Sequence, residues 1–232
     1  MSPLHVVFDL DDTLYPERDF AIGGFQAASR WLSKTHGLAL DVERMIVLLD
    51  AGHLGGLFKI VLAEVMPQYG PDVLKGLLQS YSSYEPRLAL FADAADALAR
   101  LDGRLCMGLI TDGHAKTQQK KIAALGIASI FDHIVLTGAL GPDRLYHKPH
   151  PRSFVEIEAA LGAPGDRFVY VGDNPAKDFL APNARGWLTI EIDRPTTRTT
   201  RIHKNAVIPE GGAPQLRLNT LADLPKLLIE RI

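Results

Sequence analysis

Apolar runs alternate with amphipathic segments along most of the chain. Five of the runs have the length and the β-branched or aromatic content of buried strands: 5–10, 105–111, 133–137, 168–172 and 187–192. The segments 115–125 and 151–161 have helical periodicity, and each is followed by a glycine, the residue that most often ends a helix. This alternation predicts βα units and an α/β fold with a parallel sheet.

The interval between the first two predicted strands is too long for a single crossover and has helical patterns of its own. Apolar residues recur at helical spacing at Phe25, Ala28 and Leu32, and again within 42–49, 57–65 and 73–78. Glycine and proline clusters separate these segments. We therefore expect an inserted helical module at 16–88, with 1–15 and 89–232 forming the core domain.

Composition is that of an ordinary globular chain of 232 residues, with 47% hydrophobic residues and a formal net charge of -2. This balance gives no sign of a nucleic-acid partner. No segment reaches the roughly 18 continuous apolar residues of a membrane helix. The amino terminus has no positive region followed by a signal-like apolar core, so we expect no signal peptide. The single cysteine, Cys106, lies in an apolar run, so no intramolecular disulfide can form. We expect a cytoplasmic protein without a membrane partner; its oligomeric state is not readable from the sequence.

Candidate chemistry begins directly after the first predicted strand, with the segment Asp9-Leu10-Asp11-Asp12-Thr13. Asp and Thr also favour helix caps and turns, so the segment alone could be a capping turn. Carboxylates crowded at the end of a buried strand repel one another unless a cation binds them. Hard divalent cations such as Mg²⁺ prefer oxygen ligands and often bind phosphate at the same time. The segment therefore points to phosphate chemistry.

Three later segments end or follow predicted strands in the same way. Thr111 ends one strand, Lys148 follows another, and Asp173 and Asp178 follow a third. Taken singly, Thr111 could belong to a turn, Lys148 to the surface, and the two aspartates to the cap of a helix that Pro175 would start. Ligands of open α/β sheets bind outside the carboxyl ends of the strands. The shared placement favours one site over four unrelated turns.

This order of motifs, DxDxT, then a strand-ending Thr, then Lys, then GDxxxxD, resembles the haloacid dehalogenase-like hydrolase superfamily over essentially the whole chain. The resemblance implies a Rossmann-like three-layer core with a parallel sheet. It also implies that the module at 16–88 is an α-helical cap that closes over the active site. The interval between Thr111 and Lys148 has room for only about one helix and one strand, so we expect no second cap.

The resemblance also implies roles for the residues that match its motifs. Asp9 would be the nucleophile that becomes an aspartyl-phosphate, and Asp11 would protonate the leaving oxygen and then deprotonate water. Thr111 would bind the phosphate together with the neighbouring Asp112 and Gly113. Lys148 would balance the carboxylates and contact the phosphoryl oxygens.

The same resemblance implies a Mg²⁺ site. Its ligands would be the Asp9 carboxylate, the backbone carbonyl of Asp11 and the Asp173 carboxylate. Asp178 would bind the metal through water or orient the site. Because Asp9 and Asp11 are two residues apart, both side chains can reach one site only if the strand has ended and the chain is turning.

The function that these features predict is a Mg²⁺-dependent phosphatase acting on a small phosphorylated metabolite, such as a sugar phosphate, a nucleotide or a phosphoglycolate-like ester. A phosphomutase of the same superfamily is the main alternative. A 2-haloacid dehalogenase is disfavoured because halide needs no protonation, whereas Asp11 supplies an acid. A phospho-receiver switch is disfavoured because its phosphorylated aspartate lies on a later strand than its metal-binding acidic pair.

Residues that select the substrate are expected in the helical module. His53 and Lys59 lie in the glycine-rich segment 51–59, whose glycines allow unusual backbone angles. We expect these two side chains to contact the substrate. Trp31 falls on the apolar side of the first helical segment, where a core position is expected.

Overall fold

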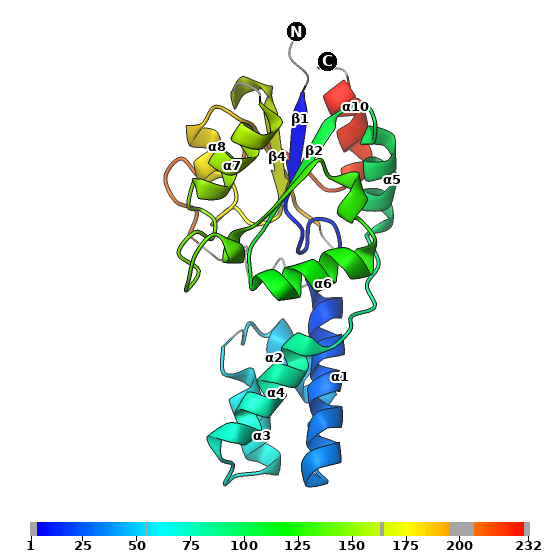
Figure 1. Ribbon diagram of the computed structural model, residues 1–232, viewed down its shortest axis with the longest axis vertical. Coiled ribbons are helices and arrows are strands. Elements are labelled where there is room, and N and C mark those ends of the chain that lie inside the picture. Colours follow the sequence, from blue (N-terminus) through cyan, green and yellow to red (C-terminus); the bar gives the residue numbers. More distant parts are fainter. Residues whose placement is uncertain (1–3, 54, 163–164, 195–206, 230–232) are drawn as a thin grey trace. The chain divides into compact units, whose positions relative to one another are not determined.

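The core of the computed structural model is a six-stranded, fully parallel sheet in the order β3-β2-β1-β4-β5-β6 (Figure 1). The structure describes residues 4–53, 55–162, 165–194 and 207–229. The strands are β1 His5–Phe8, β2 Cys106–Thr111, β3 His133–Leu136, β4 Phe168–Gly172, β5 Leu188–Ile192 and β6 Leu216–Leu218. The central strand β1 is buried along its whole length, as expected for a parallel sheet covered on both faces.

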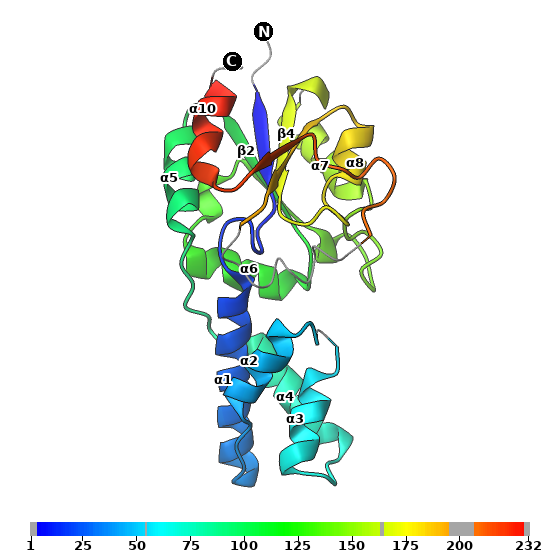
Figure 2. The ribbon, with the colours of Figure 1, turned by 180° about the vertical axis from the view of Figure 1, so that it is seen from behind.

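Helices flank the sheet and make the core a three-layer α/β domain, as the strand and helix pattern predicted. The helices α7 and α8 lie on one face, and α5 and α10 lie on the other (Figures 1 and 2). The core helices are α5 Ala92–Leu101, α6 Ala115–Leu125, α7 Arg152–Leu161, α8 Leu180–Ala184 and α10 Leu224–Ile229, with short 3-10 turns η1 Ala128–Ile130, η2 Thr137–Ala139, η3 Gly165–Arg167 and η4 Leu221–Asp223. Aromatic side chains fill the layer beneath α7 and α8: Phe154, Phe168, Tyr170, Phe179 and Trp187.

Two helix ends agree with the glycine signals. Gly126 ends α6 with φ +68°, and Gly162 ends α7 with φ +67°. Both angles lie in the left-handed region that favours glycine. The glycine pattern thus predicted both ends correctly.

The expected helix start at Pro175 is wrong. Turns occupy the chain after Gly172, and α8 begins only at Leu180. The Asn174 side chain accepts a hydrogen bond from the Ala176 amide at 3.1 Å, and Asp178 accepts one from the Asn174 amide at 2.9 Å. Such side-chain bonds to local backbone stabilise turns in competition with a helix.

The residues of the inserted module form a separate compact unit, Glu17–Leu88, while Met1–Pro16 and Ala89–Ile232 form the other. We call the first the helical unit and the second the core unit. The helical unit contains α1 Glu17–His36, α2 Val42–Asp50, α3 Leu57–Val65 and α4 Pro71–Ser83. It has its own apolar core, to which all four helices contribute. The chain enters and leaves it at neighbouring points, because the Phe91 amide donates to the Leu14 carbonyl at 2.9 Å.

Glycines let α1 and α4 pack closely within the helical unit. A Cβ atom at Gly24 would meet the ring of Tyr81, and one at Gly76 would collide with the ring of Trp31. Trp31 is half-buried against the apolar core of the unit, as its position in the pattern predicted. The tight contacts mean that the absence of a side chain at Gly76 is a packing requirement.

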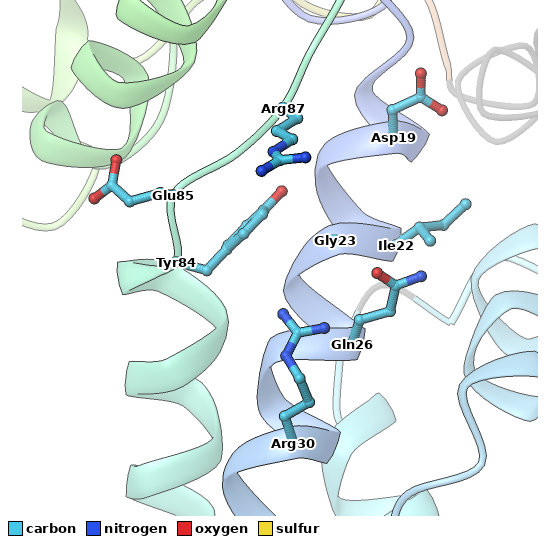
Figure 3. Close-up of a pocket in the computed structure, with 8 residues that line it drawn as sticks. All are labelled: Asp19, Ile22, Gly23, Gln26, Arg30, Tyr84, Glu85 and Arg87. Carbon is cyan, nitrogen blue, oxygen red and sulfur yellow. The ribbon is translucent and has the colours of Figure 1, made fainter.

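A hollow of about 570 Å³ lies on the helical unit between α1 and the segment that follows α4 (Figure 3). Its lining residues are Asp19, Ile22, Gly23, Gln26, Arg30, Tyr84, Glu85 and Arg87. The Tyr84 hydroxyl donates to the Phe20 carbonyl at 2.6 Å and so fixes one wall. Two arginines and two carboxylates share this lining, so the hollow carries both signs of charge.

No helix in the described residues is both long enough and apolar enough to cross a membrane. The stretch 194–204 is rich in Thr and Arg, a composition that predicts a solvated loop. All of it except Arg194 lies outside the described residues. Arg194 does not fit that expectation, because it is buried, pairs with Asp93 at 2.7 Å and donates to the Thr13 carbonyl at 3.2 Å. An ion pair and a cation–π contact with Phe91 stabilise this buried guanidinium.

Candidate functional site

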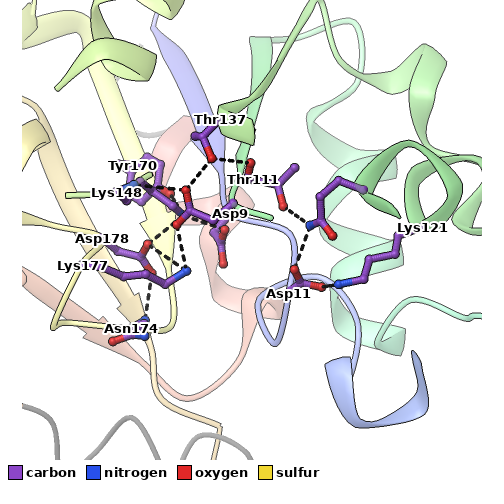
Figure 4. A network of polar contacts seen from close by, with 12 residues as sticks. Asp9, Asp11, Thr111, Lys121, Thr137, Lys148, Tyr170, Asn174, Lys177 and Asp178 are labelled. Carbon is purple, nitrogen blue, oxygen red and sulfur yellow. Dashed lines mark hydrogen bonds and ion pairs between the residues drawn. The ribbon is translucent and has the colours of Figure 1, made fainter. Parts of the chain in front are cut away.

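The loop after β1 turns sharply and brings two carboxylates to the same end of the sheet. The Asp9 amide donates to the Val171 carbonyl at 2.9 Å, which extends the hydrogen bonding between β1 and β4 by one residue beyond Phe8. The chain then makes a tight turn in which Asp12 adopts φ +56° and its amide donates to the Tyr15 carbonyl at 3.0 Å. Asp11 therefore sits in a turn rather than in a strand. This geometry lets Asp9 and Asp11 both reach the site (Figure 4).

Three buried carboxylates form the acidic cluster of the site. Asp9, Asp173 and Asp178 each offer an oxygen, and these oxygens all lie within 4.8 Å of one another. One oxygen of Asp9 and one of Asp173 have no hydrogen-bond partner among the described residues. Burial raises the pKa of the Asp173 carboxyl well above its usual range, and the carboxylates of Asp178 and Asp9 raise it further. Clustered hard oxygens with unused acceptor capacity are suited to a divalent cation.

Lys148 brings the compensating positive charge into this cluster. Its side chain is fully buried, and its Nζ lies 2.7 Å from Asp9 Oδ1 and 2.8 Å from Asp178 Oδ1. It also donates to the Tyr170 hydroxyl at 2.8 Å. Burial opposes the charge on this amine, but Asp178 and Asp9 outweigh burial and raise the pKa of Lys148. Lys148 is therefore a permanent cation beside the carboxylate of Asp9.

Asp112 supports the Lys148 segment from the end of β2. Its Oδ1 accepts hydrogen bonds from Thr137 Oγ1 at 2.8 Å and from the Lys148 amide at 3.1 Å. Lys177 approaches its other oxygen at 3.4 Å and Asp178 Oδ1 at 4.0 Å. Burial opposes ionisation of Asp112, but Lys148 and Lys177 outweigh it and lower its pKa. Asp112 thus anchors the loop that carries Lys148.

Asp11 accepts hydrogen bonds from three side chains on the other side of the site. Tyr15 donates to Oδ1 at 2.5 Å, Lys121 donates to Oδ1 at 2.7 Å, and Gln118 donates to Oδ2 at 2.9 Å. Gln118 also donates to the Thr111 hydroxyl. Burial raises the pKa of Asp11, but the charge and hydrogen bond of Lys121 outweigh burial and lower it. The Asp11 carboxylate is therefore ionised and held in one orientation.

The core unit gathers the motif residues that the sequence singled out: Asp9, Asp11, Thr111, Asp112, Gly113, Lys148, Asp173 and Asp178. Gly113 has φ +119° and lies against the Gln118 side chain. His53 and Lys59 belong to the helical unit instead and are exposed there. Neither lines the hollow of that unit.

Several polar side chains of the site were missed: Tyr15, Gln118, Lys121, Thr137, Tyr170 and Lys177. Gln118 and Lys121 carried a readable signal, because they are three residues apart on α6 and therefore share a helix face with the buried Ile122. Lys177 lies inside the motif that contains Asp173 and Asp178. Thr137 and Tyr170 sit among apolar strand residues and gave no such signal.

Comparison with known proteins identifies the family. A family model for haloacid dehalogenase-like hydrolases matches residues 4–185. This chain is a haloacid dehalogenase-like hydrolase. It is 27% identical over 234 residues to a glyceraldehyde 3-phosphate phosphatase of Methanopyrus kandleri. This alignment covers 95% of this chain and 98% of the relative. It is 25% identical over 187 residues to an (S)-2-haloacid dehalogenase of Xanthobacter autotrophicus, covering 75% and 72% of the two chains.

The fold of this haloacid dehalogenase-like hydrolase also matches solved structures. A superfamily member from Geobacter sulfurreducens superposes with a TM-score of 0.66 at 18% identity, covering 97% of this chain and 96% of that chain. At such low identity the likeness concerns the fold. It agrees with the α/β class predicted from the sequence.

Proposed function

We propose that this hydrolase is a Mg²⁺-dependent phosphatase that releases phosphate from a small phosphorylated metabolite through an aspartyl-phosphate on Asp9. The observation that carries the proposal is that the carboxylates of Asp9 and Asp11 have different hydrogen-bond partners in the same site. Asp9 lies in the acidic cluster against Lys148, whereas Asp11 has its own donors on α6. One carboxylate can therefore attack phosphorus while the other handles protons.

In the first half-reaction, an Asp9 carboxylate oxygen attacks the phosphorus atom of the ester. The bond between phosphorus and the ester oxygen breaks, and its electron pair stays on the leaving oxygen. Asp11 is ionised in the free protein, so it first takes up a proton, which the monoanionic form of the phosphate ester supplies. It then gives this proton to the leaving oxygen, so an alcohol leaves. Lys148 and the Thr111 hydroxyl stabilise the phosphoryl oxygens, because anionic oxygens would otherwise repel the attacking carboxylate.

In the second half-reaction, water attacks the phosphorus atom of the aspartyl-phosphate. The Asp11 carboxylate takes a proton from this water, and the bond between phosphorus and the Asp9 oxygen breaks. Asp9 returns as a carboxylate, Asp11 regains its proton, and inorganic phosphate is released. The pair of carboxylates is thereby ready for another turnover.

The acidic cluster fits a hard cation, since it combines close carboxylate oxygens with unused acceptor positions. Asp9, Asp173 and the backbone carbonyl of Asp11 would hold Mg²⁺, and Asp178 would bind through water or orient the site. When bound, the metal would neutralise charge on the phosphoryl oxygens. Bound Mg²⁺ would also favour the ionised form of Asp173, whose pKa is raised by burial and by its acidic neighbours in the absence of a metal.

Asp11 favours a phosphatase over a haloacid dehalogenase. A haloacid dehalogenase has no need for an acid, because halide leaves without a proton. A phosphomutase uses the same core chemistry and remains the runner-up. Several relatives that match this chain are named as phosphatases of small esters, glyceraldehyde 3-phosphate and phosphoserine among them. These names support a small phosphate ester as the substrate class.

The helical unit, by this proposal, is the cap that selects the substrate, and His53 and Lys59 are its specificity contacts. His53→Ala and Lys59→Ala should change the ranking of kcat/KM across a panel of phosphorylated metabolites. Lys75→Ala, at an exposed position of the same unit, is the matched control. Unchanged ratios in both variants would remove these two residues from the specificity site.

The nucleophile is tested by quenching turnover in acid and locating the phosphoryl group by mass spectrometry. We expect it on the peptide that contains Asp9, and Asp9→Asn should abolish turnover because an amide is a poor nucleophile. Asp96→Asn, on the exposed face of α5, is the control for a lost carboxylate. A phosphoryl group on histidine or serine, or a fully active Asp9→Asn enzyme, would contradict the proposal.

The metal is tested by thermal unfolding as well as by activity. Mg²⁺ should raise the Tm of the wild-type protein, because a ligand that binds only the folded state stabilises it. In Asp173→Asn this increase should shrink strongly, since one ligand charge is lost. Full turnover in excess EDTA, or equal Mg²⁺-induced increases in both proteins, would rule out the assigned site.

A further inference from the structure

Helix α6 presents two polar side chains to the interior of the core unit. Gln118 and Lys121 are 2% and 3% exposed, although neither side chain is usual in a core. Burying an amide and an ammonium group is unfavourable unless each finds strong partners. Their presence on the inner face of α6 therefore calls for an explanation beyond helix packing.

Gln118 and Lys121 both donate to Asp11. Figure 4 shows the contact between Lys121 and Asp11. Lys121 donates to Oδ1 at 2.7 Å and Gln118 donates to Oδ2 at 2.9 Å, so each oxygen of the carboxylate has a donor from the same helix. The Tyr15 hydroxyl adds a second donor to Oδ1 at 2.5 Å. A carboxylate held at both oxygens cannot rotate about its last bond without breaking a charge-assisted hydrogen bond.

Gln118 also links Asp11 to Thr111. Its Nε2 donates both to Asp11 Oδ2 and to Thr111 Oγ1. The reverse amide orientation would place the carbonyl oxygen of Gln118 against a carboxylate, which is unfavourable. Because the Thr111 oxygen is the acceptor here, its single hydroxyl hydrogen remains available for another acceptor. The same amide therefore orients both a proton carrier and a phosphate-binding hydroxyl.

We propose that Gln118 and Lys121 are positioning residues that hold Asp11 in register with Thr111, at the place where Asp11 exchanges a proton with the leaving oxygen and then with water. The inference rests on the proposed phosphatase function, because it assigns these residues to the acid–base step of that reaction. Neither residue is placed in contact with the substrate. Their effect is carried entirely by the orientation of Asp11 and of the Thr111 hydroxyl.

Two aryl esters of nearly the same shape separate this role from a structural one. Phenyl phosphate has a basic leaving group that needs a proton, whereas para-nitrophenyl phosphate has a leaving group that departs readily without one. The ratio kcat/KM reports the steps up to cleavage of the ester, so it excludes the later hydrolysis that both substrates share. Lys121→Met should lower kcat/KM for phenyl phosphate by about 100-fold, as for a misplaced catalytic group, and for para-nitrophenyl phosphate by less than about threefold. Gln118→Leu also removes the hydrogen bond to Thr111, so it should lower kcat/KM for both esters, and by about 10-fold more for phenyl phosphate.

The controls are on the same helix. Lys116→Met and Gln119→Leu replace the same residue types at exposed positions of α6 and should leave both ratios unchanged. Lys121→Arg keeps a charged donor and should recover part of the loss for phenyl phosphate. Circular dichroism and Tm confirm that each variant is folded; if Lys121→Met does not fold, Gln118→Leu alone decides.

Equal losses for both esters, or no loss for phenyl phosphate, would overturn the positioning role while leaving the proposed phosphatase function intact. A wild-type protein that hydrolyses neither ester nor any member of the metabolite panel would overturn the proposed function, and the positioning role with it. The selective loss described above supports both.

Discussion

Lys148 places one ammonium group against the carboxylates of Asp9 and Asp178, with no exposed surface on its side chain. Lys148→Met would leave these carboxylates buried without that cation. Removing one partner of a buried ion pair typically costs about 3 to 5 kcal/mol of folding free energy. We expect a loss of this size in urea unfolding without metal, and a smaller loss with saturating Mg²⁺.

Lys177→Met is the matched control for this change. Lys177 is 28% exposed and lies 3.4 Å from Asp112, so solvent screens its ion pair. Its removal should cost about 1 kcal/mol or less. If Lys148→Met and Lys177→Met lose the same free energy of unfolding, burial of Lys148 does not increase its contribution to stability.

His5 gives the fold a pH dependence that is separate from the site. The ring is buried at the start of β1, stacks on Phe168 at a centroid distance of 4.9 Å, and has no hydrogen-bond partner among the described residues. Burial, together with the positive charge of Arg167, lowers the pKa of His5 below its ordinary 6.5. The neutral ring is thus compatible with the fold, and protonation favours the unfolded chain.

The direction of the effect follows from linkage. The contribution of His5 to the free energy of unfolding is fully present above pH 6.5, its ordinary pKa in the unfolded chain. This contribution is lost as the pH falls toward the lower pKa of the folded protein. The loss is up to about 1.4 kcal/mol for each pH unit between the two pKa values. His5→Phe should flatten this decline in urea titrations between pH 7.5 and 5, whereas His114→Phe at an exposed position should not. The same slope in wild type and His5→Phe would contradict the account.

Single residues show what a sequence pattern can and cannot single out. Asp9, Thr111 and Lys148 were singled out because each ends or follows a predicted buried strand in a recognisable order, and their roles stay predictions. Gln118 and Lys121 were not singled out, because their importance depends on which way α6 lies across the ends of the strands. Helical periodicity gives a face to each side chain but does not say what that face meets.

At the scale of elements, the contact between α1 and α4 is the most constrained part of the helical unit. An alanine at Gly76 would put a methyl group into the ring of Trp31. Gly→Ala in a helix normally stabilises by about 1 kcal/mol, but overpacking costs about 1 to 3 kcal/mol. We therefore expect Gly76→Ala to destabilise the protein when unfolding is followed by circular dichroism.

A double-mutant cycle identifies the cause of that loss. In a Trp31→Leu background the colliding ring is absent, so Gly76→Ala should cost much less or should stabilise. Neighbouring residues that share a contact are expected to be non-additive in this way. Additive effects in the cycle would show that the collision with Trp31 is not the reason.

Elements were predicted well where the pattern was long and regular. All five expected strands and the helices 115–125 and 151–161 are present. The sixth strand, β6 Leu216–Leu218, was missed because it has three residues and none of them is buried. The helix expected at Pro175 failed because the side chains of Asn174 and Asp178 bond to local backbone. Local hydrogen bonds of this kind leave no trace in hydrophobic periodicity.

For the molecule as a whole, the hydrogen bond between Phe91 and Leu14 makes the insertion separable. Because the two points of entry lie together, a short Gly-Ser linker can replace residues 17–88 without stretching the core unit. We expect the shortened protein to keep the circular dichroism of an α/β fold and a weak activity on para-nitrophenyl phosphate. Differences in kcat/KM across the metabolite panel should largely disappear, because the proposed cap is gone.

The full-length chain, assayed on the same panel, is the control for this deletion. A shortened protein that folds but keeps the original substrate ranking would place specificity in the core unit. Failure of the shortened chain to fold would show that the core unit depends on the insertion for stability.

The position of β1 in the sheet has a consequence for synthesis. His5 pairs with Cys106 and with Phe168, so β1 is synthesised well before either of its neighbouring strands. The contacts of the helical unit are local, and such units generally fold first during translation. A folded insertion would shorten the effective loop between β1 and β2, because its two ends return to Leu14 and Phe91. Once β2 has been synthesised, β1 can therefore pair with it across a shorter effective loop than the sequence separation suggests.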